Sequence, residues 1–409
     1  MTIADLPRVR GSVIVDRYLE AVEILSSPSC VTRNFEEEAA PFKGGTVAEV
    51  NGDVHLLHRR MAAPAFGRHA IMSYEESVLG GAIERALDRA RRAEGPRADL
   101  VSLAQVILVQ VAARFVGLDD IGDPPRLEKL LTYVGRLGPG VELRWADRGI
   151  DDVIRAGLAA KAGFARDFYR PAMQRRREQA AGDEIPDARP APDLISALCR
   201  AEWDEDKKLR EAITYLTAGI RATAHIVTRT FDELEMWLAA RPADREQAYS
   251  AQGLRDACNE TLRLHPSSPA LFREAAGTIP RASGPPILPG SRIAIDMLGC
   301  STDVTVFGAD AARFRPGREL PDGVPRYGLS FGAGRHVCPG RSVVTANGPV
   351  AAPGGGSHEL LRAVVRILAR LHECGMEVDK ARKPIQATSY QRRYELYPVR
   401  FTYLSRVRH

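Results

Sequence analysis

The chain has 409 residues, and 44% of them are hydrophobic, which is enough to bury a sizeable core. Its 57 lysines and arginines exceed its 52 aspartates and glutamates only slightly, and a net charge of +5 gives no indication of nucleic-acid binding. The amino-terminal stretch lacks an apolar signal core, and no run of about 18 apolar residues follows, so we expect a cytoplasmic protein that is not inserted in a membrane.

The pattern in chain order predicts a mainly helical protein with short strands. Residues 11–27 pass from a strand-like run into an amphipathic helix, and residues 150–180 form a helical stretch rich in arginine. Residues 180–193 are rich in proline and aspartate, and we interpret them as a connection rather than a domain boundary. After residue 265, turns and short strands take over, and residues 284–300 are the clearest hairpin candidate.

The longest periodic segment spans residues 209–238, where apolar side chains recur at helical spacing and predict one helix of about 30 residues. These side chains are Leu209, Ile213, Leu216, Ile220, Val227, Phe231, Leu234 and Leu238. A second stripe beside them is polar, and it either faces solvent or lines a cavity. Its members are Thr214, Thr217, Arg221, His225 and Thr228.

One of six cysteines stands in an unusual setting. The six are scattered, without a C-x-x-C pair or a zinc-like spacing, which argues against structural disulfides. Cys338 lies in the loop FGAGRHVCPG, residues 331–340, where glycines let the backbone approach a flat group closely. A thiolate in such a loop is a strong donor to haem iron, and the alternative is a buried free cysteine in a glycine-rich turn.

The loop resembles the cytochrome P-450 family of haem-thiolate enzymes, because it fits the family signature F-G-x-G-x-H-x-C-x-G at every fixed position. The resemblance implies that Cys338 is the axial ligand of the iron and that His336 faces a haem propionate. It also implies that the remaining signature residues contact the cofactor. These are Phe331, Gly332, Gly334 and Gly340.

Other segments resemble the same family. NETLRLHP contains the family's E-x-x-R as Glu260 and Arg263, and FRPGR resembles its F-x-P-x-R, so that Arg318 would complete a buried charge network. VHLLHRRMAAPAF and LFREA look like the segments whose bases bind the haem propionates, which need cations. The implied propionate partners are His55, Arg59 and Arg273.

The resemblance implies a single domain over residues 1–409, a mainly α, triangular helical prism with small β-sheets. A b-type haem would lie between the long central helix and the cysteine loop. Compared with the family, we expect a shortened amino-terminal helix and strand region. Pro349, Pro353 and three consecutive glycines interrupt the helix expected after the cysteine, which predicts a split helix or an insertion near residues 345–357.

The central helix departs from the family pattern at the site of proton delivery. In AGIRATAH, Ala218 and Gly219 keep the groove where oxygen binds, but Arg221 stands in place of the family's acid and Ala222 in place of its threonine. The catalytic candidates are then Arg221, Thr217 and Thr223, although Thr223 points about 100° away on a helix. Arg221 binds either a substrate carboxylate or a neighbouring acid of the protein.

Three functions remain open on the sequence. The first is a bacterial P-450 enzyme that inserts oxygen into a small molecule, or couples it oxidatively, in specialised-metabolite biosynthesis, with electrons from a ferredoxin and its reductase. Exposed bases would help such a partner to dock; the candidates are Arg59, Arg60, Arg335 and Arg341. The second is a peroxide-using peroxygenase or an isomerase with an anionic substrate on Arg221. The third is a haem sensor or carrier without turnover.

Overall fold

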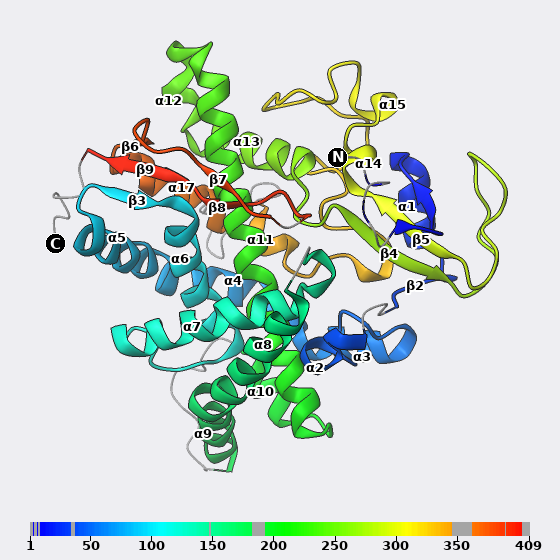
Figure 1. Cartoon of the computed structure of the whole chain (residues 1–409), viewed down its shortest axis with the longest axis horizontal. Coiled ribbons are helices and arrows are strands. Elements are labelled where there is room, and N and C mark those ends of the chain that lie inside the picture. Colours follow the sequence, from blue (N-terminus) through cyan, green and yellow to red (C-terminus); the bar gives the residue numbers. More distant parts are fainter. Residues whose placement is uncertain are drawn as a thin grey trace, which may run out of the picture. The chain divides into compact units, whose positions relative to one another are not determined.

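The structure, a computed structural model, describes residues 3, 6, 9–33, 37–146, 149–181, 193–345, 362–388 and 390–402 (Figure 1). Most of the proline-rich connection predicted at 180–193, and all but the first residue of the insertion predicted at 345–357, lie outside these described residues. The chain divides into two compact units. The first comprises residues 1–33, 225–377 and 384–397, and the second comprises residues 34–224, 378–383 and 398–409.

A mixed sheet organises the first unit, with strand order β1-β5-β4-β2. Strand β1 is parallel to β5, whereas β4 is antiparallel to both β5 and β2. The strands are β1 Val13–Val15, β2 Cys30–Val31, β4 Ala270–Ala275 and β5 Arg292–Asp296. Helix α1 (Tyr18–Ser26) follows β1 directly, as the sequence predicts, and its Ile24 joins Val15, Ile293 and Ile295 in a buried apolar cluster. Burial of these side chains fixes the register of the sheet.

The predicted hairpin at residues 284–300 is only partly correct. Strand β5 does form there, but its antiparallel partner is the upstream strand β4, and the chain continues into a short helix instead of a second strand. The remaining elements of this unit are short apart from α13 and α17. They are α12 Arg245–Ala248, α13 Ala251–Leu264, α14 Met297–Ser301, α15 Val304–Phe307, α16 Arg341–Val344, α17 Arg362–Glu373, β7 Ile385–Gln386 and β8 Tyr394–Leu396.

Helices build most of the second unit, and α7 packs along α8 (Figure 1). Strand β3, Arg97–Asp99, pairs antiparallel with β9, Pro398–Phe401, from the carboxy-terminal segment of this unit. The helices are α2 Ala40–Lys43, α3 Gly52–Ala62, α4 Arg68–Tyr74, α5 Gly80–Glu94, α6 Leu100–Val116, α7 Pro124–Val141, α8 Ile150–Phe164, α9 Arg170–Ala181 and α10 Leu194–Cys199. No described helix is long and apolar enough to cross a membrane.

Strand β6, Met376–Val378, follows α17. The long helix predicted from the sequence is present as α11, Glu205–Ala239. The polar stripe of α11 does not face solvent, because Thr214, Thr217, His225 and Thr228 are buried, although Arg221 is 31% exposed. Local bonds make this burial possible. Thr217 Oγ1 donates to the carbonyl of Ile213 at 2.8 Å, and His225 Nε2 lies 3.2 Å from the carbonyl oxygen of His265.

Candidate active site

The cysteine loop of the first unit presents a thiol to solvent. All six cysteines lie in the described part of the chain, and Cys338 is the only one among them that is exposed. Gly332 and Gly334 have φ values of +68° and +66°, and a side chain at Gly334 would collide with the carbonyl oxygen of Leu25. The amide of Cys338 donates to the carbonyl of Phe331 at 2.8 Å, which closes the loop around these glycines. The backbone therefore holds the sulfur outward.

A buried charge network lies behind this loop. Arg263 is fully buried on α13 and donates to both carboxylate oxygens of Glu260, at 2.8 and 2.7 Å. It also donates to the carbonyls of Ser301 and Ala311. Arg318 Nε lies 3.1 Å from Glu260 Oε1. The structure thus brings the three predicted network residues together, and fork-shaped guanidinium contacts compensate their burial.

The two predicted propionate partners of this unit lie on different elements. Arg273 lies on β4 opposite Ile293, and its Nη1 donates to the carbonyl of Phe272 at 2.8 Å. His336 is half-buried in a single 3-10 turn, Gly334–His336, directly before the cysteine.

In the second unit, His55 and Arg59 lie one turn apart on α3 and therefore share a face of that helix. His55 is buried, and burial together with the neighbouring charge of Arg59 lowers its pKa below 6.5. A second histidine of this helix, His58, lies 3.1 Å from Glu211 on α11 and stacks on Trp203. The contact between His58 and Glu211 ties α3 to the central helix.

Two small residues in the middle of α11 are exposed. Residues 211–217 are all buried, Ala218 and Gly219 are exposed, and Ile220 is buried again. Nothing lies within 4 Å of the position that a Cβ of Gly219 would take. Thr217 and Thr223, the threonine candidates, are both buried on either side of this gap. Between the buried residues 211–217 and Ile220, the helix thus leaves a bare patch of backbone and one methyl group.

Arg221 has a partner that the sequence did not identify. Its Nε donates to Glu142 Oε2 at 2.8 Å, and the two side chains are 31% and 22% exposed. Glu142 ends α7, and Gly138, one turn earlier on α7, lies against the Arg221 side chain. No signal in the sequence pairs residues 79 positions apart in two helices, so this contact could not be found before the fold was known.

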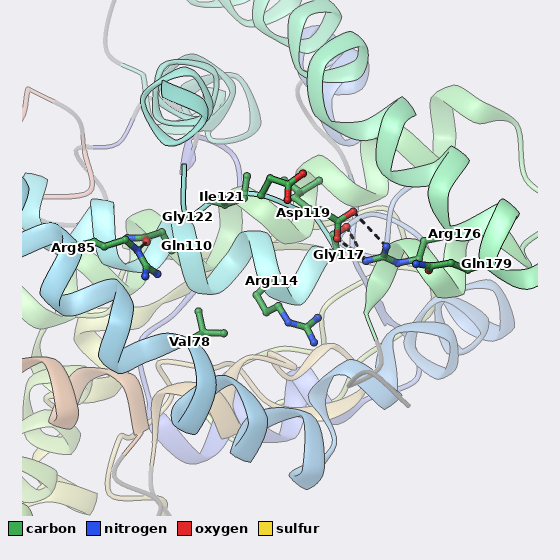
Figure 2. Close-up of a pocket in the computed structure, with 12 residues that line it drawn as sticks. Val78, Arg85, Gln110, Arg114, Gly117, Asp119, Ile121, Gly122, Arg176 and Gln179 are labelled. Carbon is green, nitrogen blue, oxygen red and sulfur yellow. Dashed lines mark hydrogen bonds and ion pairs between the residues drawn. The ribbon is translucent and has the colours of Figure 1, made fainter. Parts of the chain in front are cut away.

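A separate pocket of about 450 Å³ lies between α5, the end of α6 and α9 (Figure 2). It contains none of the predicted site residues. Arg176, which lines this pocket, donates hydrogen bonds to Asp119, to Asp193 and to the carbonyl of Gly117.

The model of the family "Cytochrome P450" matches residues 252–346, which include α13, β4 and the cysteine loop. Among curated relatives, the cytochrome P-450 monooxygenase sphH of Aspergillus fumigatus is 29% identical over 194 residues, 40% of this chain and 36% of that protein. The chain spans well under half the length of the first curated relatives that it matches.

Solved structures resemble the chain over nearly its full length. CalO2 has a TM-score of 0.73 at 16% identity, covering 97% of this chain and 94% of that chain. P-450BioI, crystallised with an acyl carrier protein ligated to hexadec-9Z-enoic acid, has a TM-score of 0.70 at 17% identity and 97% coverage of both chains. The mainly helical fold with small sheets is therefore the fold of these solved structures. Residues 252–346 thus match the cytochrome P-450 family, and the chain as a whole shares the fold of the solved structures.

Haem iron is the cofactor that this family implies, and the residues of each unit suit it. In the first unit, the exposed Cys338 sulfur on a glycine-rich loop is the donor that haem iron accepts. In the second unit, the bare patch at Ala218 and Gly219 leaves room for a group beside α11. Within the described residues, no cluster of three or more histidine, cysteine or acidic side chains offers a different metal site.

Proposed function

We propose that the chain is a haem-thiolate monooxygenase that carries b-type haem and oxidises a small organic molecule. The observation that carries this proposal is the exposed Cys338 thiol in the family's signature loop, on a chain with the family's fold. When bound, the haem iron would supply the chemistry that activates oxygen. The relative sphH, named as a monooxygenase, supports the same reaction class.

The protein's own residues have distinct roles in this proposal. Cys338 would hold the iron through Sγ, and Gly332, Gly334 and Gly340 would let the loop lie close to the porphyrin. Arginine and histidine donors would neutralise the two propionates, a task that suits planar or ring N–H groups. The candidates for this task are His55, Arg59, Arg273 and His336. Ala218 and Gly219 would leave space beside α11 for oxygen and substrate.

The contact of Arg221 favours a monooxygenase over the peroxygenase alternative. A substrate carboxylate on Arg221 would have to share the guanidinium with Glu142, which already accepts from Nε. We therefore propose that electrons come from NAD(P)H through a ferredoxin and its reductase. Arg335 and Arg341, both exposed on the cysteine loop and at the start of α16, give an acidic ferredoxin a basic surface. A role in specialised-metabolite biosynthesis fits this reaction class.

The first prediction concerns the ligand. After reduction and carbon monoxide treatment, the holoprotein should show the red-shifted Soret band of thiolate ligation, and Cys338→Ser should lose it because an alcohol oxygen is not a thiolate donor. Cys199→Ser is the matched control, since this half-buried thiol donates only to Met173, and it should keep the band. A band that persists in Cys338→Ser would refute the assignment.

Turnover separates the functions that the sequence left open. Incubation of the holoprotein with a panel of small organic molecules, a ferredoxin, its reductase and NADPH should give oxygenated products that depend on oxygen. Products that form only with hydrogen peroxide would replace the monooxygenase by a peroxygenase. Absence of product under both conditions, with an intact thiolate signature, would favour a sensor or carrier.

A further inference from the structure

The Arg221 side chain is built into the second unit by helix α7. Glu142, at the end of α7, accepts from Arg221 Nε at 2.8 Å. Gly138 lies one helical turn before Glu142, on the same face of α7, and a Cβ at this position would lie 2.8 Å from Arg221 Cδ. The face of α7 thus provides a notch for the aliphatic stem and a carboxylate for the charge.

Only part of the guanidinium is used by this contact. Within the described part of the chain, Arg221 makes no hydrogen bond or ion pair besides the one from Nε to Glu142. Its terminal nitrogens, Nη1 and Nη2, keep donors for a ligand. The side chain is 31% exposed and lies three residues after the exposed Ala218, on the same face of the helix. Arg221 is therefore placed to contact a small molecule beside α11.

The charge of that ligand is constrained by Glu142. The Glu142 carboxylate in contact with Arg221 offsets positive charge of the guanidinium, so Arg221 attracts an anion less than an isolated arginine would. A carboxylate bound to the terminal nitrogens would also approach the Glu142 carboxylate, and like charges in one small site disfavour each other. A neutral carbonyl oxygen accepts the same hydrogen bonds without this repulsion.

We propose that Glu142 and Arg221 act together as a specificity pair that selects a substrate with a neutral hydrogen-bond acceptor, such as a ketone, amide or lactone carbonyl, over a carboxylate. This inference rests on the proposed function, because it assigns the substrate class of that same site. Arg221 contacts the substrate carbonyl, and Glu142 is a positioning residue that also rejects anions.

Matched probes test the proposal without knowledge of the natural substrate. ω-Imidazolyl alkanoic acids of graded length, and the corresponding primary amides, carry an imidazole that ligates haem iron and a tail that differs in charge. Dissociation constants of each acid and amide are measured on the holoprotein by the Soret shift and independently by equilibrium dialysis. The proteins compared are the wild type, Glu142→Gln, the double variant Glu142→Gln with Arg221→Gln, and Glu128→Gln.

The wild type should bind the best amide about tenfold more tightly than its acid, and Glu142→Gln should tighten the acid by about tenfold while changing the amide much less. The gain should vanish in the double variant, because Arg221 then no longer provides the unmasked charge. Glu128→Gln is the matched control. Glu128 also lies on α7 and accepts from an arginine, Arg89 of α5, so its loss should leave the acid-to-amide ratio unchanged.

Three outcomes would overturn the proposal. They are an acid affinity that Glu142→Gln leaves unchanged, a gain that persists without Arg221, and an equal gain in Glu128→Gln. Failure of the proposed function would look different, because the thiolate and carbon monoxide signature would then be missing from all four proteins before any probe is added.

Discussion

At the scale of single residues, the notch at Gly138 decides how Arg221 meets Glu142. The Cβ of an alanine would lie 2.8 Å from Arg221 Cδ, which is closer than carbon atoms approach, so the arginine stem must move away from α7. The resulting displacement loosens the ion pair, although an arginine side chain is flexible enough to avoid unfolding.

Gly138→Ala should therefore change specificity more than stability. We expect the acid-to-amide binding ratio of the imidazolyl probes to shift toward the acid, in the direction of Glu142→Gln. Gly135→Ala is the control, because it lies on the same helix with nothing within 4 Å of its Cβ position. Gly135→Ala should raise the free energy of unfolding by up to about 1 kcal/mol through helix propensity and leave the ratio unchanged. An unchanged ratio in Gly138→Ala would show that the notch does not position Arg221.

At the scale of elements, the buried arginine of α13 holds the segments that follow β5. Arg263 donates hydrogen bonds to Glu260 in its own helix. It also donates to the carbonyls of Ser301 in α14 and of Ala311, and so connects these segments to α13. Truncation would leave the Glu260 carboxylate and these carbonyls buried with fewer donors. Breaking such a buried pair from one side is strongly destabilising.

Arg263→Gln should lower the free energy of unfolding by about 3–5 kcal/mol, measured by urea unfolding of the holoprotein. Arg326→Gln should change it by less than about 1 kcal/mol, because the pair of Arg326 with Asp256 lies at the surface. A similar small loss in both variants would show that burial does not give the network its importance.

The elements also show which parts of this fold follow from local sequence. Apolar periodicity over 209–238 predicts α11 to within four residues at each end. Leucine, isoleucine and phenylalanine at this spacing lie on one face only if the segment is helical. The polar stripe of the same helix is largely buried, which apolar periodicity does not predict. Local hydrogen bonds, such as that of Thr217 to Ile213, let polar side chains pack in the interior, and periodicity does not report them.

Some residues of the candidate site can likewise be recognised from the sequence, and others cannot. Cys338 and the Glu260–Arg263 pair are recognisable because each motif is contiguous in the sequence and carries its own geometry. Glu142 is not recognisable, since its role depends on how α7 crosses α11. The pairing of β5 with β4 is not predicted for a related reason, because β4 lies outside the segment 284–300 that contains the hairpin candidate.

At the scale of the whole molecule, two groups of titratable residues control how stability depends on pH. Burial, with the charges of Arg393 and Arg229, holds the pKa of His225 well below 6.5, and the pKa values of His55 and His372 are also lowered. A second group consists of carboxyls, of which Glu20 is typical. Burial works to raise its pKa, but hydrogen bonds from Arg281 and Ser283 outweigh burial and lower the pKa below 4.5.

Both groups make the folded protein bind fewer protons in acid than the unfolded chain does. The free energy of unfolding should therefore decrease in two stages as the pH is lowered. Buried His225 and half-buried His372 stay neutral when folded, so their contribution is lost progressively as pH falls below 6.5. The carboxyls contribute stability that is present above pH 4.5 and is lost as pH falls through their lowered pKa values. Urea unfolding of the holoprotein at a series of pH values measures both stages.

His225→Gln separates them, because glutamine can keep a hydrogen bond to the carbonyl of His265 but cannot take up a proton. We expect the decline that begins below pH 6.5 to become smaller in this variant, while the decline below pH 4.5 keeps its slope. A wild-type stability that stays constant between these two values would mean that His225 is protonated in the fold. Its buried position beside Arg229 and Arg393 would then have to open in mild acid.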